Sequence, residues 1–201
     1  IPLADSCICG LTMTSSHSQS IATDSIQATP PTIIVIFGAS GDLTARKLAP
    51  AIFNLSKDGL LPSTCHLIDY GRSEMSDDAF REYLKKSLES HSRRTIEDET
   101  WKSLASNITF HAGPYDNLDS FEKLEVKISA IEKSLGKDAQ CLFYVSTPPG
   151  VFMPILENLG ASGLAKRNQG QGTASKIIIE KPFGRDLKSA RELNEVINRR
   201  F

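Results

Sequence analysis

One stretch, from Thr32 to Leu43, most constrains what this chain can fold into. Thr32 to Phe37 is a short run of β-branched and aromatic residues without polar alternation, which is typical of a strand buried on both faces in a parallel sheet. The run ends in Gly38-Ala39-Ser40-Gly41-Asp42-Leu43, and a helical pattern follows as far as Leu55. A strand, a glycine turn and a helix in this order form the first βα unit of a nucleotide-binding sheet, because the helix N-terminus offers free N–H groups to a phosphate.

The spacing of these glycines leaves a second interpretation open. It is not G-x-G-x-x-G, because Ser40 stands where the second glycine would be. The pattern by itself therefore also fits an ordinary tight βα turn that binds no ligand.

Apolar runs and helical patterns alternate along the rest of the chain. Further strands are predicted at residues 65–68, 107–111, 141–145 and 176–179, and helices at residues 43–55, 76–89, 118–135, 152–165 and 185–201, with a capping-box start at 95–98. Pro50 is expected to kink the first helix or to mark a restart. The alternation predicts an α/β domain over residues 32–201 with a doubly wound parallel sheet, the Rossmann type of dinucleotide-binding domain.

Residues 1–31 differ from this pattern. They are rich in Ser and Thr and show no sustained period, so a flexible N-terminal tail is predicted. Cys7 and Cys9 lie in this tail, and two cysteines cannot close a zinc site, so they are interpreted as spectators and no metal is predicted.

Composition excludes several classes of partner. The formal net charge of -1 gives no basic surface for nucleic acid. No apolar run reaches the roughly 18 residues that a membrane span needs. The 4 cysteines are scattered, which favours a reducing compartment and a cytoplasmic protein.

The end of the second strand bears on coenzyme choice, because this position meets the adenosine ribose in a dinucleotide fold. An acidic residue there pairs with the free 2′-OH of NAD, whereas an arginine accommodates the 2′-phosphate of NADP. The sequence offers both, Asp69 and Arg72, and Ser73 adds a hydroxyl for a phosphate. A solvated arginine without a ligand is the alternative.

Every unusual segment falls at the carboxyl end of a predicted strand, where ligands of such sheets bind. These segments are Gly38–Leu43, Tyr70–Ser73, Gly113–Asp116, Thr147–Gly150 and Glu180–Gly184. In the last of them, Lys181 stands beside Pro182, and its ammonium could hold a substrate oxygen or phosphate. The alternative is a surface lysine paired with Glu180.

Five motifs at these strand ends follow one another in a specific order. They are Gly38–Leu43 with Arg46-Lys47, Tyr70-x-Arg72-Ser73, Gly113-x-Tyr115-Asp116, Phe143-Tyr144 leading into Pro148-Pro149, and Glu180-Lys-Pro-Phe-Gly-Arg-Asp-Leu187. In order and spacing they resemble the glucose-6-phosphate dehydrogenases over residues 32–201. The string from Glu180 to Leu187 is the most specific of them.

The resemblance implies NADP-dependent oxidation of D-glucose 6-phosphate to 6-phospho-D-glucono-1,5-lactone, the first step of the pentose phosphate pathway, by a homo-oligomeric enzyme. The coenzyme-binding residues that it implies are Gly38, Ala39, Ser40, Gly41, Asp42, Leu43, Arg72, Ser73, Tyr115, Pro148, Pro149 and Lys181. Arg72 and Ser73 take the 2′-phosphate, and Lys181 also binds the sugar and is the catalytic residue found in this chain. The bond between Lys181 and Pro182 is expected to be cis, as in the family.

The chain departs from the family pattern in three ways. Thr44 replaces the usual alanine, and Asp69 stands where glycine is common, which bears on the preference for NADP over NAD. The family's phosphate-binding segment Asp-His-Tyr-Leu-Gly-Lys-Glu would begin after Phe201, and the catalytic histidine and the second β+α domain lie beyond it. The chain is therefore expected to be a truncated coenzyme domain that is inactive alone. The alternatives are another Glu-Lys-Pro-type NAD(P)-dependent sugar oxidoreductase and a non-catalytic NADP-binding module.

Overall fold

A computed structural model describes residues 30–136, 139–167 and 174–201 of the chain. Most of the predicted tail, including Cys7 and Cys9, lies outside the described residues, as do residues 137–138 and 168–173. The fold and the site below are built from the described residues.

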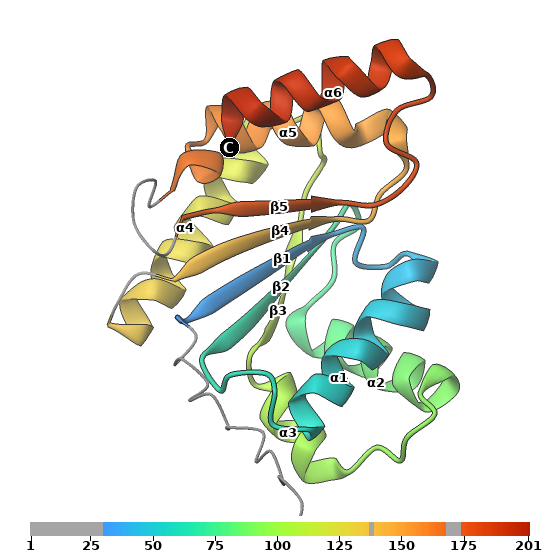
Figure 1. The fold of residues 1–201 in the computed structure, drawn as a ribbon. Coiled ribbons are helices and arrows are strands. Elements are labelled where there is room, and N and C mark those ends of the chain that lie inside the picture. The colour runs from blue at the N-terminus through green and yellow to red at the C-terminus, as the bar shows by residue number, and fades with distance from the viewer. Residues whose placement is uncertain (1–29, 137–138, 168–173) are drawn as a thin grey trace, which may run out of the picture.

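Five parallel strands form one sheet in the order β3-β2-β1-β4-β5 (Figure 1). The strands are β1 (Thr32–Phe37), β2 (Cys65–Gly71), β3 (Ile108–Ala112), β4 (Gln140–Val145) and β5 (Lys176–Ile179). Phe37 at the end of β1 lies beside Tyr70 of β2 and Val145 of β4. The parallel sheet confirms the predicted doubly wound α/β fold.

Helices cover both faces of the sheet (Figure 1). One face carries α1 (Ala49–Lys57), α2 (Asp77–His91) and α3 (Asp98–Ala105), and the other carries α4 (Leu118–Leu135), α5 (Phe152–Ala161) and α6 (Leu187–Arg200). Each face has its own apolar core, which includes Phe53 and Phe80 on the α1 face and Phe121 and Ile155 on the α4 face. Burial on both sides explains why the strands lack polar alternation.

Pro50 marks a restart of the first helix, as the sequence predicts. A π-helical segment, Thr44–Leu48, precedes α1, and the N–H of Ala49 donates to the carbonyl of Thr44. Pro50 has no N–H, and its ring would clash with the carbonyl four residues earlier in a regular α-helix. The wider π turn moves that carbonyl away, so the helix restarts with proline in its first turn.

The structure corrects the predicted end of the second strand. The sequence predicts a strand at 65–68 followed by a loop from Asp69, but β2 continues to Gly71. Tyr70 and Gly71 pair with His111 and Ala112 of β3, which extends the ladder beyond the apolar run. Asp69 is therefore a strand residue.

Two predicted helix starts are correct, and one is wrong. The side chain of Ser76 accepts from the N–H of Ala79 at the start of α2, and Asp186 forms a capping box with Ser189 at the start of α6. In α3 the N-cap is Glu97, whose side chain makes no cap bond, so the predicted capping box at Thr95 does not form.

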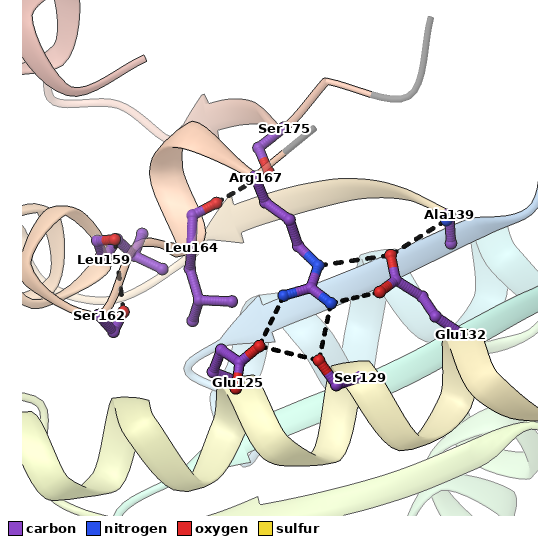
Figure 2. A network of polar contacts seen from close by, with 9 residues as sticks. All are labelled: Glu125, Ser129, Glu132, Ala139, Leu159, Ser162, Leu164, Arg167 and Ser175. Atoms are coloured by element: carbon purple, nitrogen blue, oxygen red, sulfur yellow. Dashed lines mark hydrogen bonds and ion pairs between the residues drawn. The ribbon is translucent and has the colours of Figure 1, made fainter. Parts of the chain in front are cut away.

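An ion-pair network closes the amino-terminal end of the sheet (Figure 2). The guanidinium of Arg167 donates to Glu125 at 2.7 Å, to Ser129 at 2.8 Å and to both carboxylate oxygens of Glu132, all on α4. Glu132 also accepts from the N–H of Ala139 at 3.1 Å, just before β4. Arg167 therefore joins α4 to the segments that precede β4 and β5.

Candidate functional site

The candidate site lies where the chain reverses its winding at the carboxyl edge of the sheet. From β1 the chain runs through α1 to β2 on one side, and β4 then returns to the other side of β1 (Figure 1). The segments after β1 and β4 diverge at such a switch point and leave a crevice, which is where open α/β sheets bind ligands. The turn after Phe37 and the segment after Val145 form the two sides of this crevice.

Gly38 begins the turn after β1 and has two reasons to be glycine. Its φ is +95°, and a Cβ atom there would lie 3.0 Å from the carbonyl oxygen of Ser146. The N–H of Gly41 returns to the carbonyl of Gly38 at 2.9 Å, which closes the turn. Within the described residues, the N–H groups of Ser40 and Asp42 donate to no acceptor, so they remain for a ligand at the helix N-terminus.

Two hydroxyl groups tie this turn to β4. Thr44, which is buried, donates to the carbonyl of Gly38 at 3.1 Å, and its hydroxyl lies 3.5 Å from that of Ser146. Ser146 donates in turn to the carbonyl of Phe37 at 2.7 Å. In the sequence, Thr44 stands out only as a departure from the family pattern, and no local motif marks Ser146. Their pairing joins residues more than a hundred positions apart.

A cavity of about 230 Å³ opens between these segments. Seven of its lining residues are among the predicted coenzyme-binding residues: Gly38, Ser40, Gly41, Arg72, Ser73, Tyr115 and Pro148. The other lining residues are Ser146, Thr147 and Val151. The structure therefore brings the ends of β1, β2, β3 and β4 together around one polar cavity.

Several polar groups of the cavity have no hydrogen-bond partner among the residues that the structure describes. The hydroxyl oxygen of Thr147 is buried and makes no hydrogen bond among the described residues, which is costly for a buried polar atom. Arg72 and Ser73 are exposed, and neither side chain forms a hydrogen bond or an ion pair in the described part of the chain. An arginine fork, a serine hydroxyl and an orphaned threonine hydroxyl fit a ligand rich in oxygen acceptors, such as a phosphate-bearing coenzyme.

Tyr115 forms a rigid wall of the cavity. Its hydroxyl donates to the carbonyl of Tyr70 at 3.3 Å, and its own carbonyl accepts from the side chain of Asn158 at 3.0 Å. Burial raises the pKa of Tyr115 above its ordinary value, so the phenol stays protonated. Its ring packs at an edge against Phe37 and Tyr70, so Tyr115 is a fixed surface for a ligand.

The remaining predicted site residues lie near the cavity but do not line it. Ala39 is fully buried and donates its N–H to Tyr70, and Asp42 pairs with Arg46 at 3.5 Å. Pro149 lines a neighbouring cavity of about 320 Å³ between α5 and α6. Leu43 is likewise absent from the lining.

Lys181 is exposed and follows β5, at the same edge of the sheet. The expected cis bond between Lys181 and Pro182 is confirmed. Within the described residues Lys181 forms no ion pair with Glu180, so the alternative of a lysine paired with its neighbour is wrong.

Asp69 does not take part in the site, which corrects the interpretation that its carboxylate meets the ribose. Its side chain is 2% exposed and borders a cavity of about 20 Å³ in the core beneath α1, α2 and α3. Burial raises its pKa well above the ordinary range, and its Oδ1 has no hydrogen-bond partner in the described part of the chain. Because side chains alternate along a strand, a residue inside β2 points into a core and cannot reach the loop beyond Gly71.

No helix among the described residues is both long enough and apolar enough to cross a membrane. No group of His, Cys, Asp or Glu side chains among them has the arrangement of a metal site.

The family model described as "Glucose-6-phosphate dehydrogenase, NAD binding domain" matches residues 35–201. The chain is 41% identical over 170 residues to glucose-6-phosphate 1-dehydrogenase of Chlamydia pneumoniae, covering 84% of this chain and 33% of that protein. It is 39% identical over 169 residues to the protein of the same name from Cyberlindnera jadinii, covering 84% of this chain and 32% of the relative.

Solved structures agree with these relatives. A glucose-6-phosphate dehydrogenase in complex with its substrate glucose 6-phosphate matches with a TM-score of 0.72 and 35% identity, over 86% of this chain and 35% of that one. Glucose-6-phosphate 1-dehydrogenase from Mycobacterium avium matches with a TM-score of 0.72 and 26% identity, over 86% of this chain and 34% of that one. The chain thus spans about a third of the length of the relatives that it matches.

Proposed function

The chain belongs to the glucose-6-phosphate dehydrogenase family through its NAD-binding domain, and from this premise we propose that residues 32–201 supply the NADP-binding domain for oxidation of glucose 6-phosphate. The product is 6-phospho-D-glucono-1,5-lactone, and the reaction is the first step of the pentose phosphate pathway. The relatives' names and the substrate named for the solved complex support this assignment.

The observation that carries the proposal is the polar cavity between β1 and β4. Its glycine turn, together with Arg72, Ser73 and the hydroxyl of Thr147, which lack side-chain partners among the described residues, offers groups that a phosphate-bearing ligand would satisfy. An ordinary βα turn without a ligand gives no reason for a buried hydroxyl to lack a partner.

Each group has a role in the proposed binding. The backbone after Gly38 approaches the pyrophosphate, and Arg72 with Ser73 holds the 2′-phosphate that distinguishes NADP from NAD. When bound, the nicotinamide accepts a hydride from C1 of the sugar. Lys181 faces the same edge, and its ammonium orients a sugar or coenzyme oxygen there.

We also propose that the protein acts in the cytoplasm and that the whole enzyme is a homo-oligomer. Two other functions remain as alternatives, namely another Glu-Lys-Pro-type sugar oxidoreductase and a non-catalytic NADP-binding module. The family match favours the first proposal over both. A Glu-Lys-Pro enzyme for another sugar would also bind the coenzyme and would differ only in its substrate. A non-catalytic module would bind NADP but would not catalyse the reaction, whether alone or assembled with other chains.

The test is a titration of the chain with NADP and with NAD, repeated for Arg72→Ala. Loss of a charge-assisted contact should weaken NADP binding by about 1.5–3 kcal/mol and leave NAD binding nearly unchanged. Arg93→Ala is the matched control, because Arg93 is also exposed and lies outside the cavity. Equal losses for both coenzymes, or binding of neither by the unmodified chain, would contradict the proposal.

A further inference from the structure

Lys181 follows an edge strand of the sheet, not one of the central strands. This strand, β5, has 4 residues and pairs with β4 alone. A lysine that binds a ligand needs a fixed backbone and an ammonium that is not paired with another side chain. A short edge strand by itself provides neither.

Glu180, the residue before Lys181, is anchored twice to β4. Its N–H donates to the carbonyl of Val145 at 3.1 Å, which continues the ladder one step past β5. Its carboxylate accepts a hydrogen bond from the hydroxyl of Tyr144. Tyr144 lies opposite Ile178 in the register, so its ring reaches diagonally along the same face of the sheet to Glu180.

The other end of the segment that joins β5 to α6 is fixed against α6. Gly184 has a φ of +84°, and a Cβ atom there would lie 2.6 Å from the backbone nitrogen of Ala190. The N–H of Arg185 donates to the hydroxyl of Ser189 at 2.9 Å. The backbone is thus held on both sides of Lys181, while the lysine itself is exposed.

The hydrogen bond from Tyr144 also determines which group the carboxylate of Glu180 pairs with. A carboxylate next to a lysine in the sequence is an available counter-ion, yet Lys181 has no ion pair in the described part of the chain. The pKa of Tyr144 is raised to about 12 by burial and by Glu180, so the phenol keeps its proton and remains a donor at neutral pH.

These contacts lead to an inference that rests on the proposed function and deepens it. We propose that Tyr144 is a positioning residue for Lys181: its hydroxyl holds the carboxylate of Glu180 and so leaves the neighbouring ammonium free for an anionic ligand. Tyr144 itself is not among the residues that line the cavity. Without its hydroxyl, Glu180 turns to Lys181 and competes with the ligand.

The experiment measures binding of NADPH by fluorescence to the unmodified chain, Tyr144→Phe, Lys181→Met and their double variant. Tyr144→Phe should weaken binding roughly three- to tenfold, the size of one typical hydrogen bond within a protein. The double variant should bind no more weakly than Lys181→Met, because Tyr144 acts through Lys181. Lys176→Met is the matched control, since this exposed lysine lies at the opposite end of β5.

Rescue separates this role from a structural one. Adding Glu180→Gln to Tyr144→Phe removes the competing charge and should return the affinity to within about twofold of the unmodified chain. Acetylation of Lys181, compared with Lys176 by mass spectrometry, should slow in Tyr144→Phe and recover with Glu180→Gln. If Tyr144→Phe does not fold, Glu180→Asp is the second variant, because the shorter carboxylate cannot reach the hydroxyl and should weaken binding similarly.

Three outcomes would overturn the inference. If Lys181→Met weakens binding and Tyr144→Phe does not, Tyr144 has no influence on Lys181. If the loss in Tyr144→Phe is not rescued by Glu180→Gln, the hydroxyl is only structural. Both results leave the proposed function intact, whereas an unmodified chain that binds no NADPH would remove the proposed function and this inference with it.

Discussion

Polar side chains gather at both ends of the sheet. Those at one end are paired with each other, whereas those at the other end lack partners among the described residues. At the amino-terminal end, Arg167 is 17% exposed and bonds to Glu125, Ser129 and Glu132 within the chain (Figure 2). At the carboxyl end, Arg72 is exposed and has no partner among the described residues. Arginine forms its strongest bonds to acceptors that are fixed in advance, so the first cluster stabilises the fold and the second is available to a ligand.

The largest effect that tests this comparison is expected from Arg167→Met. It leaves Glu125 and Glu132 close together without a cation, and breaking a half-buried pair should lower the free energy of unfolding by about 2–3 kcal/mol. Urea unfolding measures this loss. Arg93→Met is the control, and a loss of equal size there would show that the network has no special role.

The network also predicts a dependence on pH. The pKa of Glu125 is lowered first by its hydrogen bond from Arg167 and then by that from Ser129. Its contribution to stability is therefore complete above the unfolded pKa of about 4.3 and is lost as the pH falls through the lower folded pKa. Arg167→Met should unfold with a weaker dependence on pH in this acid range than the unmodified chain.

A smaller effect of opposite sign is expected from Asp69→Val. The carboxyl of Asp69 is buried beside a cavity of about 20 Å³ and its Oδ1 has no partner in the described part of the chain, so an apolar side chain should raise the free energy of unfolding by about 1–2 kcal/mol. Because burial raises the folded pKa, the unmodified chain loses stability as the pH rises above about 4. The advantage of the variant should thus be larger at pH 8 than at pH 5.

Unfolding curves for Asp69→Val at the two pH values decide this point, with Asp69→Asn as the control that keeps a polar group. An advantage that does not change with pH would mean that folding does not raise the pKa of Asp69. NADP affinity should stay the same in both variants. A change in affinity would instead support the interpretation that Asp69 contacts the ribose.

The smallest effect on stability is expected from Thr147→Val, which keeps the shape of the side chain and removes the orphaned hydroxyl. The free energy of unfolding should rise by less than about 1 kcal/mol, because the hydroxyl has no hydrogen bond to lose among the described residues. NADP binding should weaken severalfold, since the ligand would supply the missing partner. Stability measured by urea and affinity measured by titration should therefore move in opposite directions, and a loss of stability would place Thr147 with the structural groups.

The sequence determined the elements of this protein because their signals are local. Apolar runs without alternation predicted the strands of a parallel sheet, and Gly38 marked the turn at the switch point. Pro50 marked the restart of the first helix. The motifs at the strand ends also identified the family and most of the residues that line the cavity, since the carboxyl ends of parallel strands share one edge.

Tertiary structure decided which side chains meet and which face they occupy. Asp69 looked like a loop carboxylate, but pairing with β3 extends β2 beyond it and turns its side chain into the core. The links from Thr44 to Ser146, from Tyr144 to Glu180 and from Arg167 to α4 join distant residues, so no local pattern announces them. Periodicity tells which residues form a strand, whereas only the assembled sheet fixes the neighbours that satisfy a polar group or leave it free for a ligand.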